Sequence, residues 1–189
     1  LAINAGGTVD GRNNWNVIAA NSNDFVQNMA RIDHNFSERH RLFGRFTHSW
    51  PHFYRGDILQ NQVRGLDRYR KQRGLGLDDV ITLSPTTIVN LKYGFTRFLE
   101  SDFPFTQGYD LASLGFPSSL IGQFDGQAIR FPRIAPDTVV PLGETTNRQW
   151  VTNYHNFAGS VSKMHGNHSL RFGAEHRLMR ENSVDFGRG

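Results

Sequence analysis

The sequence predicts an all-β protein, an antiparallel meander of about six long strands that forms part of a transmembrane β-barrel. A unit of two alternating runs around a four-residue polar turn occurs three times, with turns at 37–40, 84–87 and 165–168. Several runs are about ten residues long, the length that a tilted membrane-spanning strand needs, whereas strands in soluble domains usually have about 5–6 residues. These runs are 27–36, 41–50, 88–98 and 169–179. Short turns at one end and long loops at the other are typical of outer-membrane barrels.

Each run has one apolar and one polar face, because successive side chains of a strand point to opposite sides. The apolar set is predicted to face lipid and comprises Ile32, Leu42, Phe46, Leu91, Tyr93, Phe95, Leu170 and Phe172. The opposite set is predicted to face a polar lumen and comprises Arg31, Asp33, Arg45, Lys92, Arg171 and Glu175. Asp79 is an exception, since it falls on the apolar side of its run.

A soluble sheet protein is the alternative explanation of such an apolar face, since a sandwich buries that face against a second sheet. Run length favours the membrane barrel over this alternative. No stretch approaches the ~18 consecutive apolar residues of a membrane helix, and the mean hydropathy is negative. These features exclude a helical membrane protein and leave a barrel open, because barrel strands are only half apolar.

The sequence offers little for catalysis or cofactor binding. There is no cysteine among the 189 residues, which excludes a disulfide framework and a thiolate metal site. The spaced histidines His48/His52 and His165/His168 are interpreted as surface groups rather than metal ligands. No catalytic serine motif or phosphate loop is present, so we expect no enzyme activity, no metal and no cofactor.

The net charge of +4 is modest, and part of it is concentrated in a cluster of basic residues. This cluster comprises Arg64, Arg68, Arg70, Lys71 and Arg73. We interpret it as a solvated rim rather than a nucleic-acid surface, because regular interleaving with aromatic residues is missing. Contact with lipid phosphates at the outer rim is the alternative.

One partial β-barrel domain over residues 1–189 is the expected organisation, with no plug domain. Hairpins are expected at about 24–50, 69–99 and 148–180, and long outward loops at 51–68 and 100–147. Residues 1–23 are rich in Asn and Gly and are expected to form a further external loop. Because the chain begins at Leu1 and ends just after a strand-like run, we expect an internal piece of a longer protein.

Residues 31–46 resemble a barrel hairpin of TonB-dependent outer-membrane receptors, through a motif whose serine opens the periplasmic turn. The motif residues are Arg31, Asp33, His34, Ser37, His40 and Arg45. Stretches 83–90, 114–117 and 165–175 are similar to the same group, so the resemblance spans about 24–182. The combination is most similar to the Oar-like branch, which carries a carboxypeptidase-regulatory-like domain before its plug.

This resemblance implies a 22-stranded barrel with a plugged lumen, to which the chain contributes about six strands. It implies import of a scarce nutrient across the outer membrane of a Gram-negative bacterium. The implied partners are membrane lipid and lipopolysaccharide, the TonB energy-transducing complex through an absent N-terminal part, and an unknown imported substrate, with no nucleic acid. The alternative function is a soluble or surface-exposed β-sheet module that binds a ligand such as a glycan.

Structural roles are expected for the polar residues of the hairpins. Asp33 and Arg45 are expected to pair across neighbouring strands, which contributes about 0.2–1 kcal/mol. The hydroxyls of Ser37 and Ser84 are expected to accept hydrogen bonds from their turn backbones. Gly166 and the residue after it tolerate a positive φ, as a tight hairpin turn requires.

Overall fold

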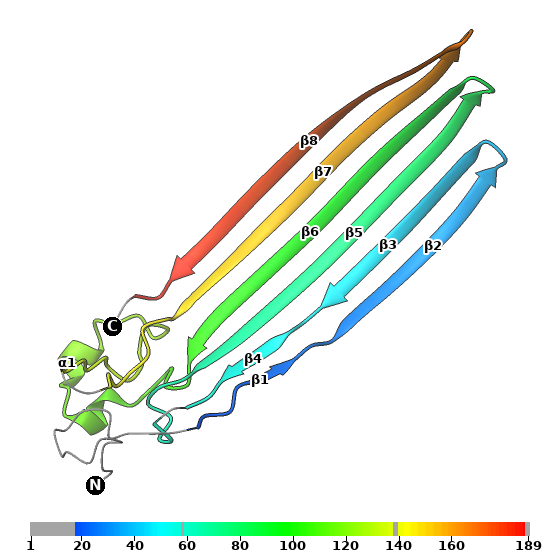
Figure 1. Cartoon of the computed structure of the whole chain (residues 1–189). Helices are drawn as coiled ribbons and strands as arrows, with labels where there is room; N and C mark the ends of the chain where they lie inside the picture. Colours follow the sequence, from blue (N-terminus) through cyan, green and yellow to red (C-terminus); the bar gives the residue numbers. More distant parts are fainter. Residues whose placement is uncertain (1–17, 58, 138–139, 188–189) are drawn as a thin grey trace.

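The chain forms a single antiparallel sheet of eight strands, seen in a computed structural model that describes residues 18–57, 59–137 and 140–187 (Figure 1). The strands are β1 (Ser22–Asp24), β2 (Gln27–Ser37), β3 (His40–Ser49), β4 (His52–Arg55), β5 (Leu66–Ser84), β6 (Thr87–Pro104), β7 (Arg148–His165) and β8 (His168–Asp185). Two short helical segments, η1 (Leu111–Leu114) and α1 (Ser118–Ile121), lie between β6 and β7. The predicted external loop at 1–23 lies largely outside the described residues, and at its end the prediction is wrong, because Ser22 and Asn23 belong to β1.

Six long strands form the expected meander in sequence order, β2-β3-β5-β6-β7-β8, and every pairing is antiparallel. The short strands β1 and β4 pair with each other, and β4 continues the pairing of β3 along β5. The all-β antiparallel prediction is therefore confirmed.

The ladder passes a proline between β3 and β4. Pro51 has no N–H and cannot donate to the sheet, but its carbonyl oxygen accepts from the Arg70 N–H at 3.0 Å. The Trp50 N–H also reaches the Val26 carbonyl oxygen at 3.0 Å. The strand therefore resumes after one irregular step as β4, and β5 begins at Leu66, so that the expected loop 51–68 is shortened to the connection between Arg55 and Leu66.

Both central strands are longer than their sequence pattern indicated. The second hairpin was expected at 69–99, whereas β5 and β6 cover Leu66–Ser84 and Thr87–Pro104. Paired charges occupy the added ends, where the apolar alternation has stopped. With 18 or 19 residues each, β5 to β8 exceed the ~9–11 residues that cross a bilayer. The strand ends at the loop side therefore extend beyond the span that a membrane requires.

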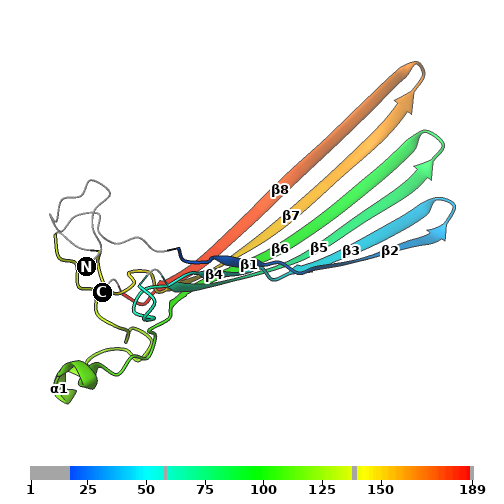
Figure 2. The same cartoon turned by 60° about the horizontal axis from the view of Figure 1, so that its bottom comes forward.

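The three tight turns lie together at one end of the sheet, and the long connections lie at the other (Figures 1 and 2). Each turn joins its two strands through two residues, at 38–39, 85–86 and 166–167. The expected capping is present, because Ser37 Oγ accepts from the Arg39 N–H at 3.2 Å and Ser84 Oγ accepts from the Thr86 N–H at 3.3 Å. Gly166 adopts a φ of +57°.

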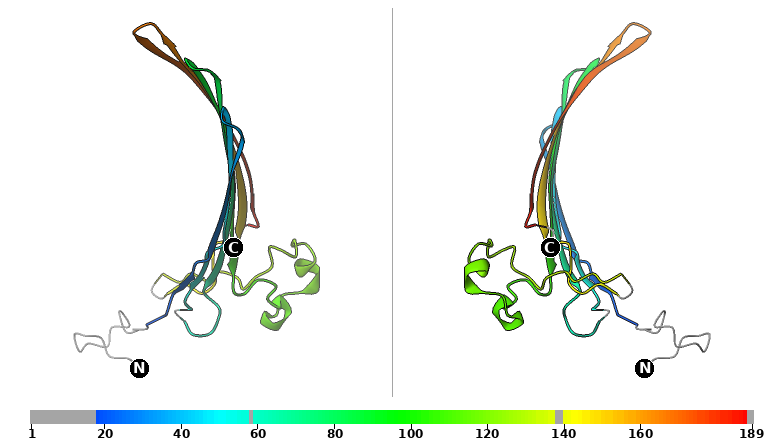
Figure 3. Two further views of the ribbon diagram at one scale, coloured as in Figure 1. Left: turned by 90° about the vertical axis from the view of Figure 1, so that its right-hand side faces the viewer. Right: turned by 90° about the vertical axis from the view of Figure 1, so that its left-hand side faces the viewer.

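The sheet is a single curved layer rather than half of a sandwich (Figure 3). Among the described residues, the buried apolar side chains are Leu66, Leu111 and Phe131. Leu111 and Phe131 belong to the connection between β6 and β7, not to the middle of the sheet. Large apolar side chains such as Phe46 and Phe172 remain exposed on the strands. α1 and every other helical segment of the described chain fall short of the length and apolarity that a membrane-crossing helix requires.

A substitution at Gly166 tests the third turn. A Cβ at this position would meet no atom within 4 Å, so backbone strain rather than a clash decides the outcome. We expect Gly166→Val to destabilise the folded barrel by about 1–2 kcal/mol, the cost of a left-handed conformation for an L-residue. Gly166→Asn should lose much less, since Asn visits this region more readily. Urea unfolding of the full-length protein in detergent measures the difference, and equal losses for both variants would contradict the explanation.

Candidate functional site

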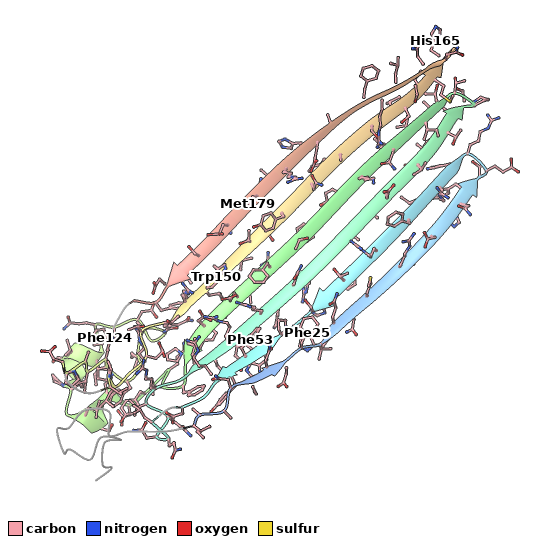
Figure 4. The ribbon with its side chains drawn as sticks, in the orientation of Figure 1. Phe25, Phe53, Phe124, Trp150, His165 and Met179 are labelled. Atoms are coloured by element: carbon pink, nitrogen blue, oxygen red, sulfur yellow. The ribbon has the colours of Figure 1, made fainter. Side chains whose placement is uncertain are left out.

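The strand register defines two faces of the sheet, because residues directly opposite each other in a pair share a face. Phe46 lies opposite Leu75, and Leu75 lies opposite Phe95. By the same rule, all eight residues predicted to face lipid lie on one side, here called the apolar face, and all six predicted lumen residues lie on the other, here called the polar face. Side chains line the strands along the whole sheet (Figure 4). Which medium each face meets stays a prediction.

Asp79, the exception on the apolar face, has a partner from another strand. His40 Nε2 lies 2.8 Å from Asp79 Oδ1, and the ring of Phe36 stacks on His40 with centroids 4.8 Å apart. All three residues lie close to the turn end of the sheet. The carboxylate is therefore hydrogen-bonded rather than isolated among apolar side chains.

The expected ion pair between Asp33 and Arg45 is wrong. The register places Arg45 directly opposite Arg31, and Asp33 opposite Phe43. Asp33 instead pairs within its own strand, where Arg31 Nη2 lies 2.7 Å from Asp33 Oδ1. The Arg31 guanidinium also lies 4.4 Å from the centroid of the Phe43 ring. Arg31 thus contacts both Asp33 and the Phe43 ring, and Arg45 does not pair with Asp33.

The other predicted polar-face residues take part in local pairs or open surface. Lys92 Nζ lies 3.1 Å from Asp78 Oδ2, and Asn90 Nδ2 donates to Asp78 Oδ1 at 2.6 Å. Glu175 accepts from Arg177 Nε at 2.6 Å. Arg171 reaches Ser160 Oγ at 3.5 Å. These contacts bring neighbouring residues together without forming a common centre.

The most concentrated polar site lies at the loop end of the polar face, where β5 and β6 extend beyond the predicted second hairpin and β7 begins. This rim network comprises Arg68, Arg70, Glu100, Asp102 and Arg148. Arg68 Nε lies 2.5 Å from Asp102 Oδ1, and Arg148 Nε lies 3.3 Å from Asp102 Oδ2. Arg70 pairs with Glu100, which also lies 3.4 Å from Arg68. Three guanidinium groups therefore share two carboxylates.

Burial and aromatic packing orient the rim network. The carboxylates of Glu100 and Asp102 are almost fully covered, whereas 47 % of the Arg148 side chain is exposed. The Arg148 guanidinium lies 4.5 Å from the Trp150 ring centroid, and that of Arg70 lies 4.8 Å from Phe53. The network carries one excess positive charge and exposes guanidinium edges beside aromatic faces. Such a surface can donate hydrogen bonds to an anionic or hydroxyl-rich ligand.

An open cleft adjoins the rim network on the side of the short strands. It has a volume of about 250 Å³, and its walls include Phe53, Tyr54 and Arg55 together with Arg68 and Arg70. Sequence reasoning missed this site because it ended the second hairpin at 99. A usable signal existed in the acids at positions 100 and 102, which continue the polar alternation of their strand.

Arg130, which is almost fully buried, holds the connection between β6 and β7 to the sheet. Its Nη1 donates to the Ala128 carbonyl oxygen at 3.2 Å, and its Nη2 donates to that of Gly187 at 2.5 Å. Burial lowers the pKa of the Arg130 guanidinium, while Asp185 and Glu144 act in the opposite direction. Arg130 therefore ties this long connection to the end of β8.

The part of the chain that the structure describes contains no candidate metal site. No three His, Cys, Asp or Glu side chains gather there in an arrangement that holds an ion. His52 Nε2 instead lies 2.8 Å from Asp67 Oδ1 and stacks on Tyr69. His165 and His168 face each other as the last pair before the third turn.

Comparison with protein families adds an independent observation. The family described as "Outer membrane beta barrel domain" matches residues 2–189. The chain belongs to this family. Membership agrees with the single antiparallel layer and points to an outer-membrane location. Comparison with curated proteins and with solved structures gives no significant match.

Removing a charge from the rim network tests its contribution to stability. Asp102→Asn leaves Arg68 and Arg148 without their shared carboxylate. We expect a loss of about 1–3 kcal/mol, less than the ~3–5 of a fully buried pair because both arginines reach solvent. Glu181→Gln on the same face is the matched control, since Glu181 accepts a hydrogen bond from the neutral Thr152 hydroxyl. Urea unfolding in detergent measures both variants, and indistinguishable midpoints would contradict a stabilising network.

Proposed function

We propose that the chain forms part of the barrel of a TonB-dependent receptor in the outer membrane of a Gram-negative bacterium. In this proposal the protein binds a scarce nutrient outside the cell and imports it with energy delivered by TonB. The observation that carries the proposal is the hairpin motif around Ser37, which resembles those receptors and occupies a two-residue turn in a sheet of the outer-membrane barrel family. A barrel of 22 strands and an Oar-like relationship belong to the same proposal.

The rim network is the proposed region of contact with the imported ligand. It lies on the polar face and next to the long connections, at the end of the sheet away from the tight turns (Figure 1). In barrels of this kind the short turns face the periplasm and the long loops face outward. A ligand arriving from outside therefore meets the exposed guanidinium groups of Arg148 and Arg70 before it reaches the middle of the lumen.

The partners follow from the same proposal. Lipid and lipopolysaccharide contact the apolar face, TonB acts through an N-terminal part outside this chain, and nucleic acid has no role. We propose no catalytic activity and no cofactor. The soluble ligand-binding module is not favoured, because the described sheet has no second layer over its apolar face and the family is one of membrane barrels.

Dependence on TonB tests the proposed transport. In the native host, deletion of the gene and deletion of the gene for TonB should produce the same growth defect when one nutrient limits growth. The assay is a panel of media, each limiting in one iron chelate, cobalamin or oligosaccharide. Restoring the gene on a plasmid should repair the first strain and leave the second unchanged. A growth defect that appears only in the gene deletion, on a medium where loss of TonB has no effect, would contradict the proposal.

A charge at Phe46 tests the proposed lipid contact of the apolar face. Phe46 lies seven residues after Arg39 of the first turn, near the middle of the expected span. Phe46→Arg should cost about 2–4 kcal/mol, the penalty of an arginine facing the bilayer midplane. Gly94→Arg is the matched control on the polar face, where Gly76 and Asn156 lie opposite and leave room. Yields of heat-resistant folded protein in the outer membrane measure both, and equal yields would count against a lipid-facing Phe46.

A further inference from the structure

The apolar face changes character at one level of the sheet. In the direction from the tight turns to the long loops, an apolar residue is succeeded on the same face by an arginine in three strands. The pairs are Leu75 and Arg73 in β5, Phe95 and Arg97 in β6, and Leu178 and Arg180 in β8. These three residues, Arg73, Arg97 and Arg180, are called the arginine row. All three side chains are exposed.

Register joins the arginine row across four strands. Arg73 lies directly opposite Arg97, Arg97 opposite Asn153, and Asn153 opposite Arg180. Arg97 Nη1 donates to Asn153 Oδ1 at 3.1 Å, so the asparagine bridges toward the last arginine. The three cations are therefore neighbours on one surface, although 107 positions separate the first from the last in the sequence.

Distance from the turns places the row at the outer edge of a membrane. Arg73 precedes Pro85 by 12 residues, Arg97 follows Thr86 by 11, and Arg180 follows the last turn by 13. At ~3.3 Å per residue these steps are about 36–43 Å along the strands. A strand tilt of ~35–45° converts them to roughly 30 Å along the membrane normal, just beyond an apolar band ~25 Å tall. The row thus lies level with outer-leaflet headgroups.

The arginine row carries positive charge that no carboxylate balances in the part of the chain that the structure describes. Like charges directly opposite each other repel, and in the described residues none of the three arginines lies within ion-pair distance of a carboxylate. Two acids of the apolar face on β5 have other partners, since Asp79 pairs with His40 and Asp67 with His52.

The rim network provides an internal comparison on the same strands. Its arginines on the polar face, such as Arg68 and Arg70, are matched with buried carboxylates. At the loop end of these strands the two faces therefore differ, because the arginines of the rim network have carboxylates and the arginine row has none among the described residues. An anion supplied from outside the protein would balance the charge of the row.

Aromatic residues accompany the arginine row. Trp50 follows the first turn at a similar distance and its ring lies 4.6 Å from that of His48, which is directly opposite Arg73. Tyr69 lies two positions beyond Lys71 on the same face. Both aromatic side chains are partly exposed. Tryptophan and tyrosine mark the membrane interface in barrels of this kind, so they indicate the same level as the arginines.

We propose that the arginine row binds the phosphate groups of lipopolysaccharide in the outer leaflet. Guanidinium groups match phosphate oxygens in a two-pronged geometry, and one phosphate between Arg73 and Arg97 replaces their repulsion with attraction to a shared anion. The acyl chains of the same lipid then lie along the apolar face below. This proposal rests on the lipid contact of the apolar face described above.

Thermal unfolding of the full-length protein in detergent tests the proposal, with purified lipopolysaccharide as the probe. The test variant is Arg73→Gln/Arg97→Gln/Arg180→Gln. The control, Arg41→Gln/Arg45→Gln/Arg171→Gln, removes the same charge from the polar face. We expect lipopolysaccharide to raise the unfolding temperature of the wild type and the control. The test variant should need a lipopolysaccharide concentration at least roughly tenfold higher for the same rise in unfolding temperature.

Two further probes identify the interacting group. Removing the lipid A phosphates should weaken stabilisation as much as removing the arginines does. Dephosphorylated lipopolysaccharide should therefore raise the unfolding temperature of the wild type no more than intact lipopolysaccharide raises that of the test variant. Inorganic phosphate at the same concentration should leave the unfolding temperature unchanged. A full response by the test variant, no response by the wild type, or equal responses to both forms of lipopolysaccharide would each overturn the proposal.

A separate measurement checks the orientation on which the proposal depends. The chain has no cysteine, so a fluorophore can be attached at Leu91→Cys on the apolar face or at Lys92→Cys on the polar face. Brominated lipid should quench the first and spare the second. If Leu91→Cys is not quenched, the lipid-facing assignment has failed. If it is quenched and the arginine variant still responds fully, only the phosphate proposal has failed.

Discussion

The continuous backbone ladder from β2 to β8 is the constraint on which the rest of this structure depends. A hydrocarbon medium supplies no hydrogen bonds, so every strand in the span must satisfy its N–H and C=O groups on its neighbours. The same ladder sets the register, and a slip by one residue would exchange the two faces. The ladder even continues past Pro51, because Arg70 donates to its carbonyl oxygen.

Register turns a half-apolar sequence into two surfaces of different chemistry. On the polar face, charges such as Lys92 and Asp78 meet partners a few ångströms away. On the apolar face, aliphatic and aromatic side chains form a band with the His40–Asp79 pair near the turns and the arginine row at the opposite limit. No protein layer covers this band in the described residues. The contacts of this band therefore come from outside the described sheet.

Strand length connects the membrane span to the site. Because β5 to β8 have 18 or 19 residues, several residues at the loop end lie beyond the ~9–11 that cross a bilayer. These residues hold the rim network, where Asp102 is shared by Arg68 and Arg148. Arg130 fastens the neighbouring connection to the end of β8. The rim network is thus part of the sheet itself, and its arginines lie at the loop end, beyond the residues needed to cross a bilayer.

The sequence by itself determined the three turns, the six long strands and the composition of each face, because these depend on local signals. Ser37 and Ser84 cap their own turns, and period-two alternation marks the strands on either side. Only the tertiary structure decided which charges meet. Asp33 pairs with Arg31 rather than Arg45, and Arg73 lies opposite Arg97. The lengths of the strands at their loop ends were decided in the same way. Such contacts depend on the exact length of each turn and on the register shift beside it, at Asn35/Ser37 and at Thr82/Ser84. Alternation within a single strand encodes neither of these.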